Sequence, residues 1–536
     1  MENDELFLLL QRDYEESDER INLWRKYIMT DYGFLSVIPV ILAVTIAIKY
    51  KNVVLALFAS VLTGVMILVN YNPIKAVTET IQTYLFGQLQ DSYNAGVLVL
   101  LVFIGGFIAL MEKSGGALAF ASKASKVIKS RAKVQLAAWI GGIIIFFSDL
   151  GTPLIIGPIF EPLFDKLKVS KEKLAYIIDS TASPVAVLVP FIGWGVYIMG
   201  LIQKEYELLG ITESDWTAFI KSIPFNIYSI LAVLFVPLIA FAGYEFSAMA
   251  KAEKRVQETG EKYWKTSRPM RKTDTEGAVE SKSSLIFVPL FVLFITLFGI
   301  LAPLGFPFTQ VPGSAFRGAL STGYLLAAAV LIAMMVYYKV KSFEETFSIY
   351  LGGMAKMMNV AIILVLAWSL SAVSKELGTS AYIISITDGN LPAFLIPAVT
   401  FLIGAVLSFA TGSSWGTYAI LMPLVIPMSV ALGAPLYASI GAVLAGGMFG
   451  DHCSPISDTT ILASSGAGCD HVDHVKTQLP YALMNGGASF IGYLLAGITG
   501  SALSVVVSFA LLVTLYLVTS KYKGVKISDA DYSEAA

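Results

Sequence analysis

Cysteine and charge are both scarce in this sequence. Its 536 residues include two cysteines, Cys453 and Cys469, which are too few for a disulfide framework. Charged residues make up 14% of the chain, whereas ordinary soluble domains carry about 25%. The formal net charge is −2 and no long basic block occurs, so nucleic acid is not an expected partner. The first thirty residues are acidic and have no apolar core, so we expect no cleavable signal peptide.

Apolar runs, in contrast, are abundant. Hydrophobic residues make up 56% of the chain, and its mean hydropathy is +0.71. One helix needs about 20 apolar residues to cross the hydrocarbon layer, and the chain has about a dozen such stretches. We therefore expect an all-α polytopic membrane protein without a soluble catalytic domain, hence no enzyme and no cofactor. Strong spans are expected at 34–49, 53–69, 95–112, 224–246, 284–303, 319–338, 355–372, 480–498 and 500–519.

Two further apolar regions, 134–203 and 393–465, are interrupted in their middles by Gly, Pro, Ser, Thr and Asp. A helix is expected to break at such a point. Lipid cannot satisfy the freed N–H and C=O groups, so a broken backbone at membrane depth must lie inside protein or beside a water-filled cavity. Both regions are therefore candidate sites.

The distribution of Lys and Arg predicts the orientation of the chain, because short loops rich in these residues stay in the cytoplasm. Segments 113–133 and 164–173 are both rich in them, so 134–163 is expected to enter from the cytoplasm and return as a re-entrant hairpin. The loop 373–392 is poor in them, so 393–430 is expected to be a second hairpin that enters from outside. In the cell inner membrane, the N-terminus is then outside and the C-terminus is cytoplasmic.

The two interrupted regions also share a pattern, in which four positions recur with identical spacing. An odd number of crossings separates the two units, so the second is expected to be inverted relative to the first. Transporters built in this way hold substrate between paired broken helices near the midplane. The alternative is chance, because Gly, Thr and Pro are common in membrane helices. The recurring positions are Gly151, Thr152, Pro158 and Pro162 in the first region and Gly416, Thr417, Pro423 and Pro427 in the second.

These patterns divide the chain into two repeats with flanking segments. The expected parts are an acidic N-terminal segment 1–33, a first span 34–52, repeat one 53–247 with hairpin 134–163 and broken helix 173–203, a cytoplasmic linker 248–283, a connecting span 284–318, repeat two 319–498 with hairpin 393–430 and broken helix 435–465, and a last span with the C-terminal tail 499–536.

Oxygen-bearing side chains cluster where these helices break. An ionisable group inside a membrane costs ~2.5–3.5 kcal/mol on insertion scales unless it is paired, hydrated or functional. Carboxylate, hydroxyl and carbonyl oxygens suit hard cations, and a desolvated carboxylic acid keeps its proton until a cation displaces it. Sodium and protons are therefore the expected cargo. The candidate ion-binding and proton-coupling residues are Asp149, Thr152, Asp179, Ser180, Thr181 and Ser183 in repeat one, and Ser413, Ser414, Thr417, Asp451, His452, Ser454, Ser457, Asp458 and Thr459 in repeat two.

The four aspartates have alternative roles. Asp458 is expected to be the main switch, because it lies in the second break among hydroxyl groups. Asp149 and Asp458 would otherwise cap the N-terminus of a half-helix. Asp179 and Asp451 would otherwise lie near a helix end and be merely hydrated.

The three histidines, His452, His471 and His474, lie near both cysteines in the sequence. No CxxC pair is present, so we expect no transition-metal site. His471 and His474 are expected to be solvated on a polar cytoplasmic segment, with a proton-responsive surface patch as the alternative. His452 is expected to tune Asp451 or to relay protons.

One run of residues carries a family resemblance. Residues 450–460, Gly-Asp-His-Cys-Ser-Pro-Ile-Ser-Asp-Thr-Thr, with 466–471 and 477–481 after them, resemble the signature of NhaC sodium/proton antiporters. The resemblance extends weakly over most of the membrane part. It implies paired re-entrant hairpins, a scaffold domain and a transport domain that moves as an elevator. The wider group also moves organic anions or amino acids, so the resemblance leaves the cargo open.

Two functions remain at this point. The first is sodium/proton antiport by competition at buried carboxylates. The alternative is sodium- or proton-coupled transport of a small organic acid or amino acid, in which Trp194, Trp415 and Tyr418 would line a larger pocket unless they only pack helices together. The expected partners are sodium, protons and the lipid bilayer, with a small organic solute under the alternative, and we keep a homodimer open.

Overall fold

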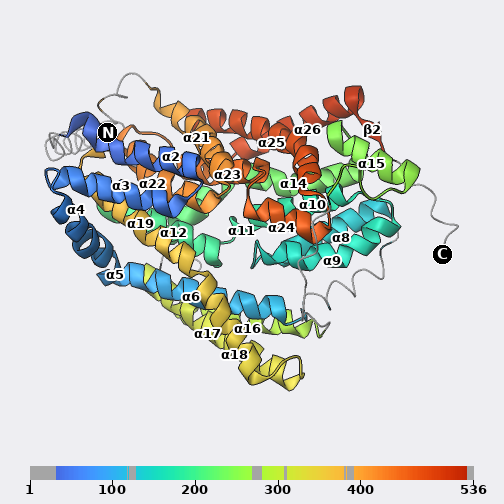
Figure 1. Cartoon of the computed structure of the whole chain (residues 1–536), viewed down its shortest axis with the longest axis horizontal. Coiled ribbons are helices and arrows are strands. Elements are labelled where there is room, and N and C mark those ends of the chain that lie inside the picture. The colour runs from blue at the N-terminus through green and yellow to red at the C-terminus, as the bar shows by residue number, and fades with distance from the viewer. Residues whose placement is uncertain are drawn as a thin grey trace, which may run out of the picture.

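The computed structural model describes residues 32–116, 119, 128, 130–268, 281–306, 311–379, 382, 385 and 391–527. Nearly all of the expected N-terminal segment, part of the expected linker and the end of the C-terminal tail lie outside these residues. The described part is helical apart from two short antiparallel strands (Figure 1). These strands, β1 (Tyr244–Glu245) and β2 (Val525–Lys526), join the chain after residue 243 to the C-terminal region.

The expected spans are confirmed as helices. Nine helices of the described part are long and apolar enough to cross a membrane, or up to ten if one bent pair is a single span. Seven of the nine expected spans lie in these helices, whereas 53–69 lies in a shorter apolar helix and 224–246 lies mainly in the bent pair. The expected boundary between the connecting span and repeat two, at 318, falls within one helix, α17 (Gly313–Tyr337). The helices that carry the nine expected spans are α2 (Ile38–Tyr50), α3 (Val53–Leu68), α6 (Ser92–Lys113), α14 (Ile227–Ala242), α16 (Ser284–Leu301), α17 (Gly313–Tyr337), α19 (Met358–Glu376), α25 (His471–Thr499) and α26 (Ser504–Lys523).

Shorter elements connect these helices. In the described part they are η1 (Gly33–Val37), α4 (Pro73–Glu79), η2 (Thr80–Leu85), α5 (Phe86–Gln90), α13 (Asp215–Ser222), η3 (Ile223–Phe225), α15 (Ser247–Thr259), η4 (Ala302–Leu304), α18 (Phe343–Lys356) and η5 (Ala393–Leu395).

Each expected hairpin is a pair of helices joined by a short turn. The first pair is α8 (Arg131–Ile144) and α9 (Gly151–Lys166), and the second is α21 (Ile396–Thr411) and α22 (Ser414–Ala431). At 1.5 Å per residue, α8 and α9 measure about 21 and 24 Å, which is less than the roughly 30 Å of a hydrocarbon core. In the second pair, α21 together with η5 (19 residues, Ala393–Thr411) and α22 (18 residues) each satisfy the length and composition of a span.

Both expected broken helices are interrupted where Pro enters the sequence. The first consists of α10 (Lys171–Thr181), α11 (Ser183–Ala186) and α12 (Gly193–Leu209), and the second of α23 (Leu436–Cys453) and α24 (Asp458–Ala467). Proline lacks the N–H that continues a helix, and it disfavours helical geometry in the residue before it. The breaks therefore follow from local chemistry, and they leave free N–H and C=O groups inside the bundle.

Each hairpin pair packs against the broken helix from the other half of the chain. α9, from the first hairpin, packs against α24 of the second broken helix, while α22, from the second hairpin, packs against α12 of the first. The first contact is made between backbones. A Cβ atom at Gly157 would lie 2.1 Å from the Gly466 carbonyl oxygen, and one at Gly466 would lie 2.1 Å from the carbonyl oxygen of Pro153. Only glycine permits this approach.

The remaining helices form the surroundings of this interlocked core. α6, α16, α17 and α18 contact one another and form a group along the lower edge of Figure 1. At the other side, α15 from the expected linker packs against α10 and α25. Its Arg255 forms a buried ion pair with Glu172 (2.9 Å), and its Glu253 pairs with Arg131. The linker helix is therefore part of the packed structure.

The α9–α24 contact predicts an asymmetry between two glycine substitutions. Gly157→Ala should destabilise the protein by about 1–3 kcal/mol, because overpacking a close backbone contact forces the helices apart. Gly299→Ala in α16 is the matched control, since a Cβ atom there meets nothing within 4 Å. Thermal unfolding of both purified variants in detergent measures the difference. Equal melting behaviour would show that the helix contact is not tight.

Candidate ion-binding site

The second break holds a buried carboxylate. Asp451 lies in the last turn of α23 and is 4% exposed. Thr459 Oγ1, in the first turn of α24, donates a hydrogen bond to Asp451 Oδ2 at 2.7 Å. The Ser457 hydroxyl lies 2.9 Å from the same Thr459 oxygen. One carboxylate and two hydroxyl groups are thus joined in a short chain across the break.

The first broken helix supplies a second buried carboxylate to the same place. Asp179, in the last turn of α10, is 1% exposed. Its Oδ2 accepts hydrogen bonds from Thr460 Oγ1 (3.2 Å) and from Gln478 Nε2 (2.6 Å). Thr459 and Thr460 are consecutive, so adjacent residues at the start of α24 contact Asp451 and Asp179 respectively. The structure therefore brings together the two breaks that the sequence places more than 250 residues apart.

Two imidazole rings face Asp179. His452 Nε2 lies 3.6 Å and His474 Nε2 lies 3.5 Å from Asp179 Oδ2. The predicted solvation of His474 is wrong, because α25 turns this side chain into the bundle and leaves it 0% exposed. His471 is partly exposed and contacts the Pro455 carbonyl oxygen at 2.7 Å. His452 Nδ1 lies 2.8 Å from the Tyr228 hydroxyl.

The tip of the second hairpin lies against the second break. Ser454 Oγ donates a hydrogen bond to the Phe409 carbonyl oxygen at 2.8 Å. Gly412, at φ +68, closes the tip, where a Cβ atom would lie 2.6 Å from the Ile456 carbonyl oxygen. The Ser413 side chain caps α22, and Thr417 Oγ1 donates to the Ser413 carbonyl oxygen at 2.9 Å. The buried Ser414 lies in the first turn of the same helix.

The tip of the first hairpin is a separate polar group. Asp149 Oδ2 accepts a hydrogen bond from Trp194 Nε1 at 2.9 Å. Thr152 Oγ1 donates to the Ser148 carbonyl oxygen at 2.8 Å, and Ser148 Oγ donates to Glu112 Oε1 at 2.7 Å. Glu112 was not among the predicted residues, because it lies on the regular helix α6 and no pattern marks it. Within the described part of the chain, no hydrogen bond links this tip to Asp179 or Asp451.

Among the predicted site residues, Asp458 is the one whose observed burial differs most from the expected burial. It is the first residue of α24, and its side chain is exposed, whereas a buried switch was expected. The reason is helical geometry, since consecutive residues of the first turn point in different directions and Thr459 and Thr460 face the interior.

The other predicted residues of the first break are also inside the bundle. Ser180 and Ser183 are buried there, and Thr181 Oγ1 donates a hydrogen bond to the Ile177 carbonyl oxygen of its own helix at 2.8 Å.

The aromatic residues pack against one another between the hairpins and α12. The Trp194 and Trp415 ring centroids are 4.0 Å apart, and Tyr197 donates a hydrogen bond to the Trp415 carbonyl oxygen. Tyr418 is fully buried and donates to the Leu444 carbonyl oxygen at 2.9 Å. In this conformation the three predicted aromatic residues therefore fill the space between α12 and α22.

The oxygen atoms around Asp451 suit a small hard cation. Among the residues that the structure describes, no three His, Cys, Asp or Glu side chains converge as a metal-ion group. A cation held here would therefore depend on hydroxyl and backbone carbonyl oxygens beside a carboxylate. The C-terminal end of α23 adds the negative end of a helix dipole.

Similarity to known proteins identifies the family of this chain. The family model described as "Na+/H+ antiporter family" matches residues 18–191 and 185–498. An uncharacterized protein of Haemophilus influenzae is 31% identical over 502 residues, which cover 90% of this chain and 95% of that protein. The malate-2H(+)/Na(+)-lactate antiporter of Bacillus subtilis is 30% identical over 201 residues, 35% of this chain and 39% of that protein.

Solved structures agree at the level of the fold. The Alcanivorax borkumensis YdaH transporter superposes with a TM-score of 0.54 at 16% identity, covering 80% of this chain and 90% of that one. The family model spans most of the chain, including both hairpins and both broken helices. The chain therefore belongs to the Na+/H+ antiporter family, and it is a multi-pass membrane protein that acts as a secondary active transporter.

Proposed function

We propose that this transporter exchanges sodium for protons at a site formed by the two broken helices, with Asp451 as the carboxylate that holds either ion. The observation that carries the proposal is the pair of adjacent threonines, Thr459 and Thr460, that contact Asp451 and Asp179. Through these two threonines, a change in the charge of one carboxylate directly affects the hydrogen bonds of the other. Both acids are almost completely buried, so neither is a surface residue that happens to be charged.

Sodium would be held mainly by repeat two. Asp451, Thr459 and Ser457 offer three side-chain oxygens within one hydrogen-bonded chain. The unwound segment after α23 adds backbone carbonyl oxygens, as in other transporters whose helices break at the ion site. Asp179 and His452 lie one contact further from the proposed sodium position. Their protonation would adjust the charge around the site when sodium binds.

Protons would compete with sodium at the same carboxylate. Removing a carboxylate from water favours its neutral, protonated form, whereas a nearby cation favours the ionised form. Binding of sodium must then release a proton, and by linkage a bound proton must weaken sodium binding to the same extent. One shared site is sufficient for exchange, because the site crosses the membrane loaded with either ion.

The other predicted residues have supporting roles in this proposal. Ser454, Ser413, Ser414 and Thr417 hold the second hairpin tip against the sodium site. Ser180, Thr181 and Ser183 line the break beside Asp179, while Asp149 and Thr152 shape the first hairpin tip. The exposed Asp458 lies at the edge of the site, where it attracts cations without being the switch.

We further propose that the hairpins and broken helices move together as the transport domain of two inverted repeats. Support comes from the reciprocal packing of α9 on α24 and α22 on α12, which ties each hairpin to the opposite repeat. The group α6, α16, α17 and α18 would then belong to the scaffold. The proposed orientation in the cell inner membrane has the N-terminus outside and the C-terminus in the cytoplasm.

A second candidate function is sodium- or proton-coupled transport of a small organic acid or amino acid. The similarity to the malate-2H(+)/Na(+)-lactate antiporter favours this candidate. Against it, the Trp194 and Trp415 ring centroids lie 4.0 Å apart, so these side chains fill the space between α12 and α22. Sodium and protons alone therefore fit the present conformation better.

The proposal predicts that Asp451→Asn abolishes sodium-dependent proton movement. The amide cannot exchange a proton for sodium, and an ionisable group at this depth is costly unless it functions. Proteoliposomes with an internal pH-sensitive dye, challenged with sodium, measure the rate. Asp458→Asn is the matched control and should keep most of the wild-type rate, because its side chain is exposed. A rate that requires added malate, lactate or an amino acid would favour the second candidate.

Competition predicts that sodium binding depends on pH. Below the pKa of the site, the apparent sodium dissociation constant should fall about tenfold for each unit of rising pH, because one proton leaves for each sodium bound. Once the carboxylate is fully ionised, the constant should stop changing. Calorimetry in buffers of different ionisation enthalpy measures both the constant and the released proton. A constant independent of pH between roughly pH 6 and pH 9 would rule out the shared carboxylate.

The proposed orientation predicts opposite labelling of two exposed loops. In a variant without Cys453 and Cys469, Tyr71→Cys should react with an impermeant maleimide in intact cells, because its loop is proposed to lie outside. Lys168→Cys, in the turn between α9 and α10, should react only after permeabilisation. Both positions are exposed, so a difference in labelling would report only the side of the membrane on which each loop lies. Labelling of Lys168→Cys from outside would overturn the first hairpin.

A further inference from the structure

A short helical segment, formed by α4, η2 and α5, joins α3 to α6. In Figure 1, α3 and α6 run across the picture, whereas α4 and α5 lie on its left side and lead from one helix to the other. α6 is long and apolar enough to cross a membrane, and α3 is a shorter apolar helix. The connecting segment therefore runs transverse to these helices, at the level where they end.

One face of this segment consists of exposed apolar side chains. They are Ile74 (80%), Val77 (50%), Ile81 (40%), Phe86 (50%) and Leu89 (49%). Positions 74, 77 and 81 have the three- and four-residue spacing of one face of an α-helix. The next step, from 81 to 86, spans five residues, but η2 is a π-helical turn and the Phe86 N–H bonds to the Ile81 carbonyl oxygen. The π turn thus keeps the apolar side chains on one face.

A second face of the segment packs against the protein. Its buried residues recur every four positions and are Ala76, Thr80, Tyr84 and Gln88. The Tyr84 hydroxyl donates a hydrogen bond to Glu376 Oε2, at the end of α19, at 2.7 Å. Ser369 Oγ donates another to the Tyr84 carbonyl oxygen at 3.1 Å. The remaining side is exposed and polar, with Lys75 and Thr83.

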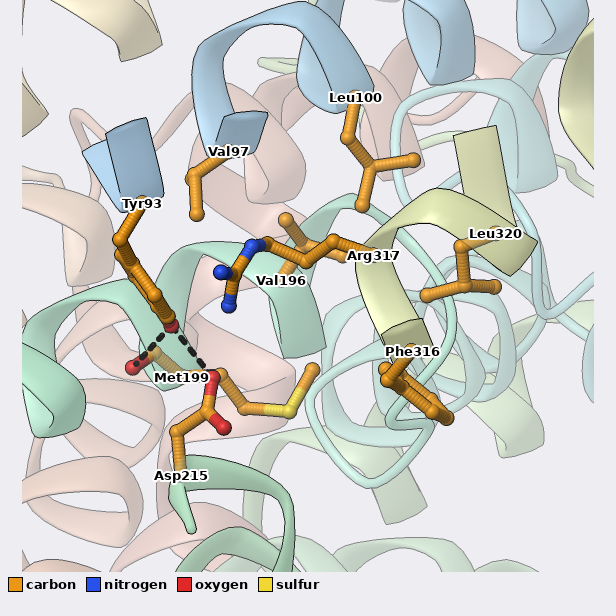
Figure 2. A pocket seen from close by; sticks show the side chains of 9 residues that line it. All are labelled: Tyr93, Val97, Leu100, Val196, Met199, Asp215, Phe316, Arg317 and Leu320. Atoms are coloured by element: carbon orange, nitrogen blue, oxygen red, sulfur yellow. Dashed lines mark hydrogen bonds between the residues drawn. The ribbon is translucent and has the colours of Figure 1, made fainter. Parts of the chain in front are cut away.

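Both ends of the segment are fixed. At its start, the Asn72 side chain caps α4, and at its end the Asp91 side chain caps α6. Tyr93 follows in the first turn of α6, and its ring lies 3.6 Å from the Arg317 guanidinium carbon (Figure 2). The Tyr93 hydroxyl also donates a hydrogen bond to Asp215 on α13. Contacts with the rest of the protein therefore set the direction in which the apolar face points.

The surroundings of this face indicate what covers it. A contiguous row of large apolar side chains is unfavourable in water and usually marks a contact with lipid or protein. The row continues the exposed apolar surface of the adjoining helices, which includes Phe58 on α3 and Val99 on α6. Lys75 and Glu79 are the only charged residues between 73 and 90, and their charges cancel. A strongly charged partner is therefore not indicated.

We propose that α4, η2 and α5 lie in the plane of the membrane surface and bind lipid. The apolar face would enter the boundary between head groups and acyl chains, where amphipathic helices bury their apolar side to a depth of about 5–10 Å. Through Tyr84, the segment then holds the ends of α3, α6 and α19 at the depth of this boundary. This proposal does not depend on which ion the broken helices carry.

Two neighbouring cysteine variants test the contact with lipid. In full-length protein without Cys453 and Cys469, Ile74→Cys and Lys75→Cys are each labelled with bimane and reconstituted into phosphatidylcholine vesicles. Both positions are exposed, and consecutive helical residues point about 100° apart. Lipid brominated close to the head group should quench the label at 74 at least about twofold more than the label at 75. Iodide in the aqueous phase should show the reverse order.

Equal quenching by brominated lipid at the two positions, or stronger iodide quenching at 74, would overturn the proposal. Adding phosphatidylglycerol to the vesicles should leave the quenching unchanged, because the segment has no net charge. Cross-linking of two Ile74→Cys copies without lipid quenching would assign the face to a second copy of the chain and contradict lipid binding. Both variants should unfold at the wild-type temperature, which controls for folding without reference to ion exchange.

Discussion

The cost of burying a carboxylate is the constraint on which the rest of this structure depends. Moving an ionised carboxylate out of water costs several kcal/mol of free energy, unless hydrogen bonds and opposite charges replace its hydration. Asp179 and Asp451 are both buried; Asp179 accepts hydrogen bonds from α24 and α25, and Asp451 accepts one from α24. These helices must therefore meet at one place. A bundle that separated α10 from α24 and α25 would leave Asp179 as an uncompensated acid in a membrane.

Close backbone contacts make this meeting sterically feasible. At the α9–α24 crossing, Gly157 and Gly466 bring main chains together where a Cβ atom on either side would clash. At the second hairpin tip, Gly412 takes a left-handed conformation and lies against the Ile456 carbonyl oxygen. Hairpin tips can thus approach the breaks without large side chains between them. The same closeness places hydroxyl and carbonyl oxygens, rather than hydrocarbon, around the acids.

Predictions from the sequence were accurate where local chemistry decides the structure. All nine expected spans are helices, and both expected breaks lie where Pro and polar residues interrupt apolar runs. They were less accurate for individual side chains. His474 was expected in solvent and is buried beside Asp179, whereas Asp458 was expected to be buried and is exposed. Gln478 and Glu112 were missed because each lies on a regular helix and has nothing unusual next to it.

The sequence alone determined the membrane class, the helices, their breaks and the family resemblance, because hydrophobic length, proline and short polar runs act within a few neighbouring residues. Only the tertiary structure decided which polar groups share a site. Asp179 and Thr460 meet across 281 positions, and Gln478 reaches Asp179 across 299. Such contacts depend on how helices rotate and cross, and a rotation of one residue in the first turn of α24 separates the buried Thr459 from the exposed Asp458.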